Sequence, residues 1–106
     1  MYQARHMLKV LRINRNTYNN WVGCRGIINA SIPAEGSGTR AEFTFDDILR
    51  ARVAQMLRNS RVDLRTAYHI ATEILNNGGA HTNTEGVRFE IDIQTVTEYI
   101  TQKLRN

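Results

Sequence analysis

The apolar positions near the start of the chain repeat at helical spacing. Ala4, Met7, Leu8 and Leu11 fall at i, i+3, i+4 and i+7, which predicts a helix over residues 4–11. Of the residues between them, Arg5, His6 and Lys9 are polar or basic and Val10 lies at the margin of the apolar side, as expected for a helix with one buried side.

A second short helix is expected from Arg15 to about Gly23, after a tight, polar turn. Asn14 precedes it, and an asparagine there can accept a hydrogen bond from a free amide of the first turn. The buried side of this helix would consist of Tyr18, Trp21 and Val22. Its outward side would carry side chains that form hydrogen bonds: Arg15, Asn16, Asn19 and Asn20.

The next segment, residues 27–45, has the pattern of a β-hairpin. Isoleucines supply the first strand, residues 33–39 (PAEGSGT) form a tip rich in glycine and serine, and residues 42–45 (EFTF) belong to the return strand. A third helix begins at Thr44, because Asp47 stands three residues later in a capping-box pattern. Its apolar positions continue to about Asn59.

A fourth helix is expected after Asp63, which can cap its first turn, and Asn77-Gly78-Gly79 ends it. Residues 80–86 (AHTNTEG) are predicted to form a polar loop. The alternation of apolar and polar positions from Val87 to Ile93 predicts a half-buried strand, and Gln94 to about Leu104 a last helix. We therefore expect a mainly α fold with a small β part.

Charge separates the two halves of the chain. Of the 14 basic and 10 acidic residues, residues 1–53 hold eight and four, and residues 54–106 hold six and six. The net charge of +4 therefore belongs to the first half, and the segment from Tyr2 to Ile28 contains no acidic residue. This asymmetry favours an anionic partner for the first half, nucleic acid or membrane, over a merely solvated basic surface.

Several classes of function find little support in the sequence. A single cysteine, Cys24, excludes an internal disulfide and a zinc site built from cysteines, and the three histidines have no metal-ligand spacing. Asp46-Asp47 is explained by helix-start chemistry rather than by acid–base catalysis. We expect no enzyme activity, cofactor, metal or small-molecule effector. We also expect no bilayer-spanning segment and no cleaved leader, and therefore a cytoplasmic protein of a bacterial or phage-infected cell.

The ordered motifs resemble the DNA-binding domain of the MerR family. That family opens with a pattern close to Y-[ST]-I-[GS]-E-[LV]-A, and later has G-[VI]-S-x-x-T-[LI]-R-[YF]-[WY]-E-x-x-G-L-[LI]. The chain has YQARHMLKVLRINRNTYNNWVGCRGII at these positions. Matching residues are Tyr2, Ile13, Thr17, Trp21, Gly26 and Ile28, and Phe43-Thr44-Phe45-Asp46-Asp47-Ile48 resembles the later R-x-Y-[ST]-x-x-D-[LI]. Arg12 replaces the family's turn glycine, Asn19-Asn20 its Arg-Tyr pair and Val22 its glutamate.

The resemblance covers residues 2–76 and implies a winged helix-turn-helix domain at 1–76. Residues 77–106 would be an appendage that either dimerises or packs back on the domain; the family's long dimerisation helix and sensor are missing. The implied function is sequence-specific binding of double-stranded DNA, as a homodimeric transcription repressor or activator of phage or mobile-element type. A recombination-directing or DNA-bending factor, and a protein-interaction module without DNA binding, are the alternatives. The expected DNA-binding residues are Arg15, Asn16, Thr17, Asn19, Asn20, Arg25, Arg40, Arg58 and Arg61.

Overall fold

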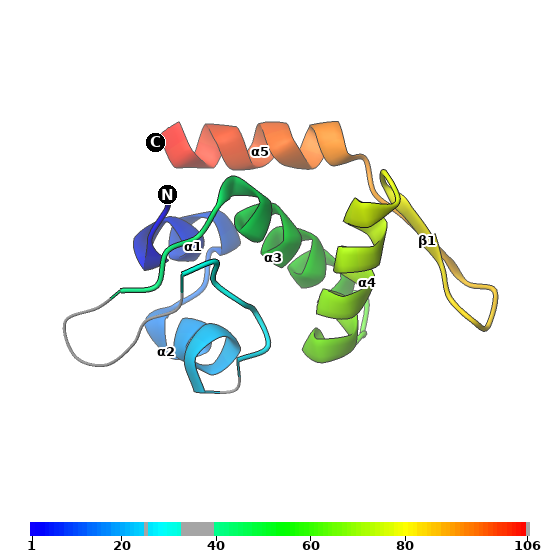
Figure 1. Ribbon diagram of the computed structural model, residues 1–106, viewed down its shortest axis with the longest axis horizontal. Helices are drawn as coiled ribbons and strands as arrows, with labels where there is room; N and C mark the ends of the chain where they lie inside the picture. The colour runs from blue at the N-terminus through cyan, green and yellow to red at the C-terminus, as the bar shows by residue number, and fades with distance from the viewer. Residues whose placement is uncertain (25, 33–39, 106) are drawn as a thin grey trace.

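Helices surround one central helix in the computed structural model, which describes residues 1–24, 26–32 and 40–105 (Figure 1). The helices are α1 (Ala4–Leu11), α2 (Arg15–Tyr18), η1 (Asn19–Cys24), α3 (Phe45–Arg58), α4 (Leu64–Asn76) and α5 (Ile93–Arg105). Two short strands, β1 (Ala80–Thr82) and β2 (Arg88–Glu90), form one antiparallel sheet. A mainly helical fold with a small sheet is thus confirmed.

Helix α3 is central because it is apolar on several sides. Its buried residues include Ile48, Leu49, Val53 and Leu57, and it packs against α1, α4 and α5. Capping by Thr44 and Asp47 is confirmed: Asp47 N–H donates to Thr44 Oγ1 over 3.0 Å, and Thr44 N–H donates to Asp47 Oδ2 over 2.9 Å. The largest fully buried side chains of the core are Phe43, Met7, Ile28, Ile48, Ile74, Ile100, Val10 and Val53.

Helix α5 folds back over the N-terminal part of the molecule. It packs against α1 and α3, with Val96 and Ile100 buried in the shared core. The Tyr99 hydroxyl donates to the Val10 carbonyl (3.4 Å), and Gln55 Nε2 of α3 donates to the Leu11 carbonyl (2.7 Å). Carbonyl groups at the end of α1 therefore find partners on both neighbouring helices.

Two expectations about β structure are wrong in detail. Between residues 27 and 45, the described residues form isolated bridges, Ile32 with Glu42 and Phe43 with Tyr2, instead of two strands; the tip 33–39 lies outside the described residues. In the C-terminal part, β2 covers only residues 88–90 of the predicted strand 87–93, and Val87 is exposed. Its partner β1 lies within the segment predicted as a loop, because pairing with β2 orders residues that have no apolar pattern of their own.

Candidate nucleic-acid interface

The turn between α1 and α2 places the second helix. Arg12 ends α1 in the left-handed conformation (φ 54°, ψ 47°), and its N–H donates to the Leu8 carbonyl. Asn14 then caps α2, as predicted, because its Oδ1 accepts a 2.8 Å hydrogen bond from Thr17 N–H. The tight turn is therefore formed with an arginine where glycine would be unstrained.

The second helix differs from the predicted single α-helix over residues 15–23. Only residues 15–18 are α-helical, and the chain continues as the π-helix η1. Tyr18 is buried as expected, whereas Trp21 and Val22 are half-buried. The wider turn changes the directions in which Asn19 and Asn20 leave the helix, and π segments of this kind are frequent at functional sites.

A first groove of about 840 Å³ lies beside this segment. Its wall contains Arg15 and Asn19 of the second helix, Arg5 of α1, and Arg40. The guanidinium of Arg15 lies 5.4 Å from the centroid of the Tyr18 ring. Stacking on an aromatic ring holds a guanidinium in place while its N–H groups stay free to bind an anion.

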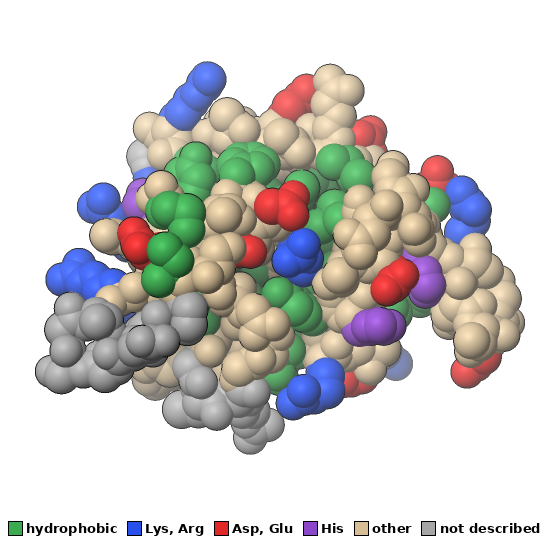
Figure 2. Space-filling model, in the orientation of Figure 1, with side chains coloured by type: hydrophobic (Ala, Val, Ile, Leu, Met, Phe, Trp, Pro, Cys, Tyr) green, Lys and Arg blue, Asp and Glu red, His purple; other side chains and the backbone are tan. Residues whose placement is uncertain are grey.

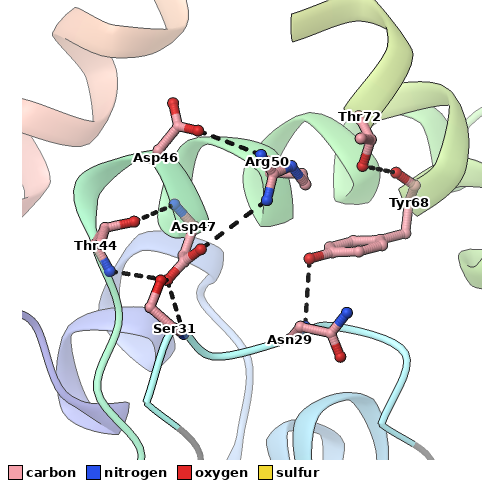
Figure 3. Close-up of polar contacts among 8 residues, drawn as sticks. All are labelled: Asn29, Ser31, Thr44, Asp46, Asp47, Arg50, Tyr68 and Thr72. Carbon is pink, nitrogen blue, oxygen red and sulfur yellow. Dashed lines mark hydrogen bonds and ion pairs between the residues drawn. The ribbon is translucent and has the colours of Figure 1, made fainter. Parts of the chain in front are cut away.

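Asn29 and Ala30 line the first groove, and the segment 29–31 is tied to α3 and α4 (Figure 3). Asp47, itself buried, accepts hydrogen bonds from the backbone N–H (3.0 Å) and the hydroxyl of Ser31. The Tyr68 hydroxyl of α4 accepts a bond from Asn29 N–H over 3.3 Å. Burial raises the pKa of Asp47, but the hydrogen bonds from Ser31 and Thr44 outweigh it and leave that pKa below its ordinary value.

A second groove of about 520 Å³ is built in the same way as the first. Asn20 and Trp21 face Arg58 of α3 and Arg65 of α4 across it, and the Arg58 guanidinium lies 5.4 Å from the Trp21 ring. Asp63 also lines this groove, where it caps α4 by accepting from Thr66 N–H. Each groove thus combines an asparagine with an arginine stacked on an aromatic ring of the α2–η1 segment.

The expected site residues divide between these grooves. Arg15, Asn19 and Arg40 line the first, and Asn20 and Arg58 line the second. Outside both, Asn16 is exposed on α2, Thr17 is half-buried, and Arg61 is exposed in the α3–α4 turn with φ 71°. Arg25 lies outside the described residues. Two further arginines line the grooves outside that set, Arg5 and Arg65. The acid-free segment 2–28 was the signal for Arg5, and the position of Arg65 with Arg58 and Arg61 around the α3–α4 turn was the signal for Arg65.

The arginines that line the grooves form no ion pair with a carboxylate of the described residues. The pairs present there join Arg50 to Asp46 (3.2 Å) and Asp47 (4.0 Å), and Arg88 to Glu90 (3.5 Å). Arg52, although in the basic half, lies 4.5 Å from the ring of Tyr99 and serves packing. On the face shown in Figure 2, acidic and basic side chains are interspersed. The first groove differs, because its charged lining residues are Arg5, Arg15 and Arg40, whereas the lining of the second groove also includes Asp63.

In the described part of the chain, metal binding would need a cluster of ligand side chains, and membrane crossing would need a long apolar helix. No group of three His, Cys, Asp or Glu side chains there could hold a metal ion, and no helix there is long and apolar enough to cross a membrane. His6 has a structural role, since its Nδ1 accepts from Gln3 N–H (2.9 Å) at the start of α1. Burial and the nearby charge of Arg5 lower the pKa of His6, which keeps this nitrogen available as an acceptor.

Comparisons of the chain with protein-family models, curated proteins and solved structures gave no match.

Proposed function

We propose that the protein binds double-stranded DNA in a sequence-selective way, through the α2–η1 segment and the grooves on its two sides. The observation that carries the proposal is the repeated arrangement of the grooves: an exposed asparagine beside an arginine that stacks on an aromatic ring. A helix fits the major groove of B-form DNA, and its flanks then face the two phosphate backbones.

The two residue types have different tasks in this proposal. The arginines of the grooves contact phosphates, which supplies affinity and makes it depend on salt. Asn19 and Asn20 read base edges, because an asparagine amide can donate to and accept from an adenine at the same time. Arg40 follows directly on the segment that would form the wing of a winged helix, and its contact with the backbone would set orientation rather than sequence.

The chain has a helix pair, then the bridged segment 27–45, then two further helices. This order supports a winged helix-turn-helix domain with the same order of elements as the MerR family. A small domain of this kind fits a transcription regulator of phage or mobile-element type. A recombination-directing or DNA-bending factor would use the same contacts, and differs in the deformation that it imposes on the duplex.

The test is a fluorescence anisotropy titration with random-sequence duplex at low salt, followed by selection of bound sequences from a random pool. We expect micromolar or tighter binding, weakened about tenfold by Arg15→Ala, which removes one phosphate contact. Arg88→Ala is the matched control on a duplex short enough to hold one copy, because it removes the same charge from β2. No binding at micromolar protein would overturn the proposal and favour a protein-interaction module; equal losses in both variants would show that the grooves are not the site.

A further inference from the structure

The hairpin β1–β2 extends from the body of the molecule beyond α4 (Figure 1). Strand β1 packs against α4, whereas β2 has its main contacts with β1 and forms the outer edge of the sheet. Arg88 and Glu90 of β2 are exposed, as is Val87 just before it, with 48% of its surface accessible. An exposed edge strand is a template for pairing with another strand.

The register of the hairpin shows which backbone groups are available on that edge. Ile91 N–H donates to the Gly79 carbonyl (2.8 Å), and Asn83 N–H donates to the Val87 carbonyl (2.9 Å). Because hydrogen-bonded and non-hydrogen-bonded pairs alternate in an antiparallel ladder, the backbone groups of Phe89 face β1 and those of Arg88 and Glu90 face away from it. The outer edge of β2 therefore offers two N–H and two C=O groups.

The sequence of β2 is complementary to itself when it is read in the opposite direction. In an antiparallel pair of two copies centred on Phe89, Arg88 of each copy lies opposite Glu90 of the other. These are the positions whose backbone groups face outward, so the same register forms four hydrogen bonds and two ion pairs. The exposed Val87 would lie opposite Ile91 of the second copy, and would be covered there.

We propose that two copies of this chain associate through the outer edge of β2, in a four-stranded antiparallel sheet with a two-fold axis at Phe89. The partner at this edge is a second copy of the chain, because the order Arg-Phe-Glu of β2 places opposite charges against each other when two copies pair antiparallel. No other segment is needed. Isologous contacts of this kind close after two subunits. Three paired residues bury much less than the ~1,200 Å² of a stable interface, so the association is weak and is strengthened wherever both copies are held together.

Sedimentation velocity of the full chain, in a concentration series that reaches millimolar, measures this association without DNA. We expect the wild type to pass from monomer to dimer, and added salt to reduce the dimer because the ion pairs are exposed. A wild type that stays monomeric throughout would overturn the proposal. So would a dimer whose dissociation constant is the same in all the variants below.

Charge exchange tests the register itself. Arg88→Glu alone and Glu90→Arg alone place like charges opposite one another, and each should weaken the dimer about tenfold. A mixture of these two variants restores opposite charges across the axis and should associate as a heterodimer. The double variant, Arg88→Glu with Glu90→Arg, should associate like the wild type. Failure of both restorations, with circular dichroism showing folded proteins, would exclude this pairing.

Discussion

The α2–η1 grooves and the β2 edge are both exposed and both charged, but their charges are arranged in opposite ways. The grooves hold Arg5, Arg15 and Arg58 with no ion pair to a described carboxylate. On β2, Arg88 alternates with Glu90, and the two already lie 3.5 Å apart within one strand. Figure 2 shows acidic and basic side chains side by side at the right-hand end, where Figure 1 places the hairpin.

This difference indicates different partners for the two regions. A surface of one sign attracts a partner of the opposite sign, and the phosphate backbone of a duplex has that character. A surface with balanced, alternating charges gains nothing from a uniformly charged partner, but it can match a copy of itself. Under the two proposals, charge arrangement, more than net charge, therefore distinguishes the region proposed to bind DNA from the region proposed to self-associate.

The largest effect on stability is expected at Asp47, the α3 residue that holds Ser31 beside the first groove. Asp47→Ala leaves the N–H groups of Ser31 and Thr44 and the Ser31 hydroxyl without their acceptor, and should lower the free energy of unfolding by about 3 kcal/mol. Urea denaturation measures this. Asp46→Ala is the neighbouring control; Asp46 is exposed and pairs only with Arg50, so its loss should cost about 0.5 kcal/mol.

The Asp47 carboxylate should also make the free energy of unfolding depend on pH. The pKa of Asp47 is lower in the folded state than its ordinary value of 3.8, so its contribution is complete above that value and is lost as the pH falls below it. Hydrogen bonds from Thr66 and Thr95 likewise lower the pKa values of Asp63 and Asp92. The measurement is therefore the difference in unfolding free energy between the wild type and Asp47→Asn, which should shrink below pH 4. A difference that stays constant from pH 7 to pH 3 would contradict the assignment.

Charge reversal in one region at a time should separate the two proposed activities, DNA binding and self-association. Arg15→Glu should reduce binding to random duplex about a hundredfold, since it replaces an attraction to phosphate by a repulsion. It should leave self-association unchanged, and the fold too, because a glutamate in the first turn of α2 suits the helix dipole.

Arg88→Glu should do the reverse. It should weaken the dimer but change binding to a short single duplex by less than about threefold, because the hairpin extends away from α2 (Figure 1) and salt screens exposed charges. Anisotropy and sedimentation on the same preparations test both. If Arg15→Glu and Arg88→Glu affect both measurements alike, the comparison of the two regions fails.

Local signals in the sequence were sufficient for most helices. α1 has the predicted bounds, α3 and α4 begin after the predicted caps, and α5 begins at Ile93, one residue before its predicted start. Apolar spacing and capping residues act within a few positions, so they can be recognised without tertiary structure.

Features that depend on distant contacts could not be predicted. The bridge of Tyr2 with Phe43 joins the two ends of the N-terminal region, and β1 exists because β2 pairs with it. The π-helical form of residues 19–24 is not encoded in apolar spacing. In the same way, the sequence indicated which residues could meet DNA, but not that Arg5 joins Arg15 in one groove while Arg58 joins Asn20 in the other.

Smaller effects should distinguish phosphate contacts from base contacts within the grooves. Arg40→Ala should weaken binding to all sequences by about tenfold and lower the slope of log affinity against log salt by about one. Asn20→Ala should leave that slope unchanged and cost ~1–3 kcal/mol only on selected sites. Titrations at several salt concentrations, on selected and random duplexes, measure both. If Asn20→Ala weakened both duplexes equally, Asn20 would not read bases.

The smallest effect concerns the turn that positions α2. Arg12 adopts the left-handed conformation, which costs a side chain with a Cβ about 1 kcal/mol relative to glycine. Arg12→Gly should therefore raise the free energy of unfolding by about 0.5 kcal/mol, after the greater freedom of glycine in the unfolded chain is deducted. Arg12→Ala is the control: it removes the same charge, keeps the strain and should give no gain in denaturation experiments. If an arginine is kept here at a cost in stability because it contacts DNA, Arg12→Gly should be more stable than the wild type and still bind random duplex more weakly. A variant that is more stable and binds equally well would limit Arg12 to a structural role in the turn, and the DNA-facing region would begin at Arg15.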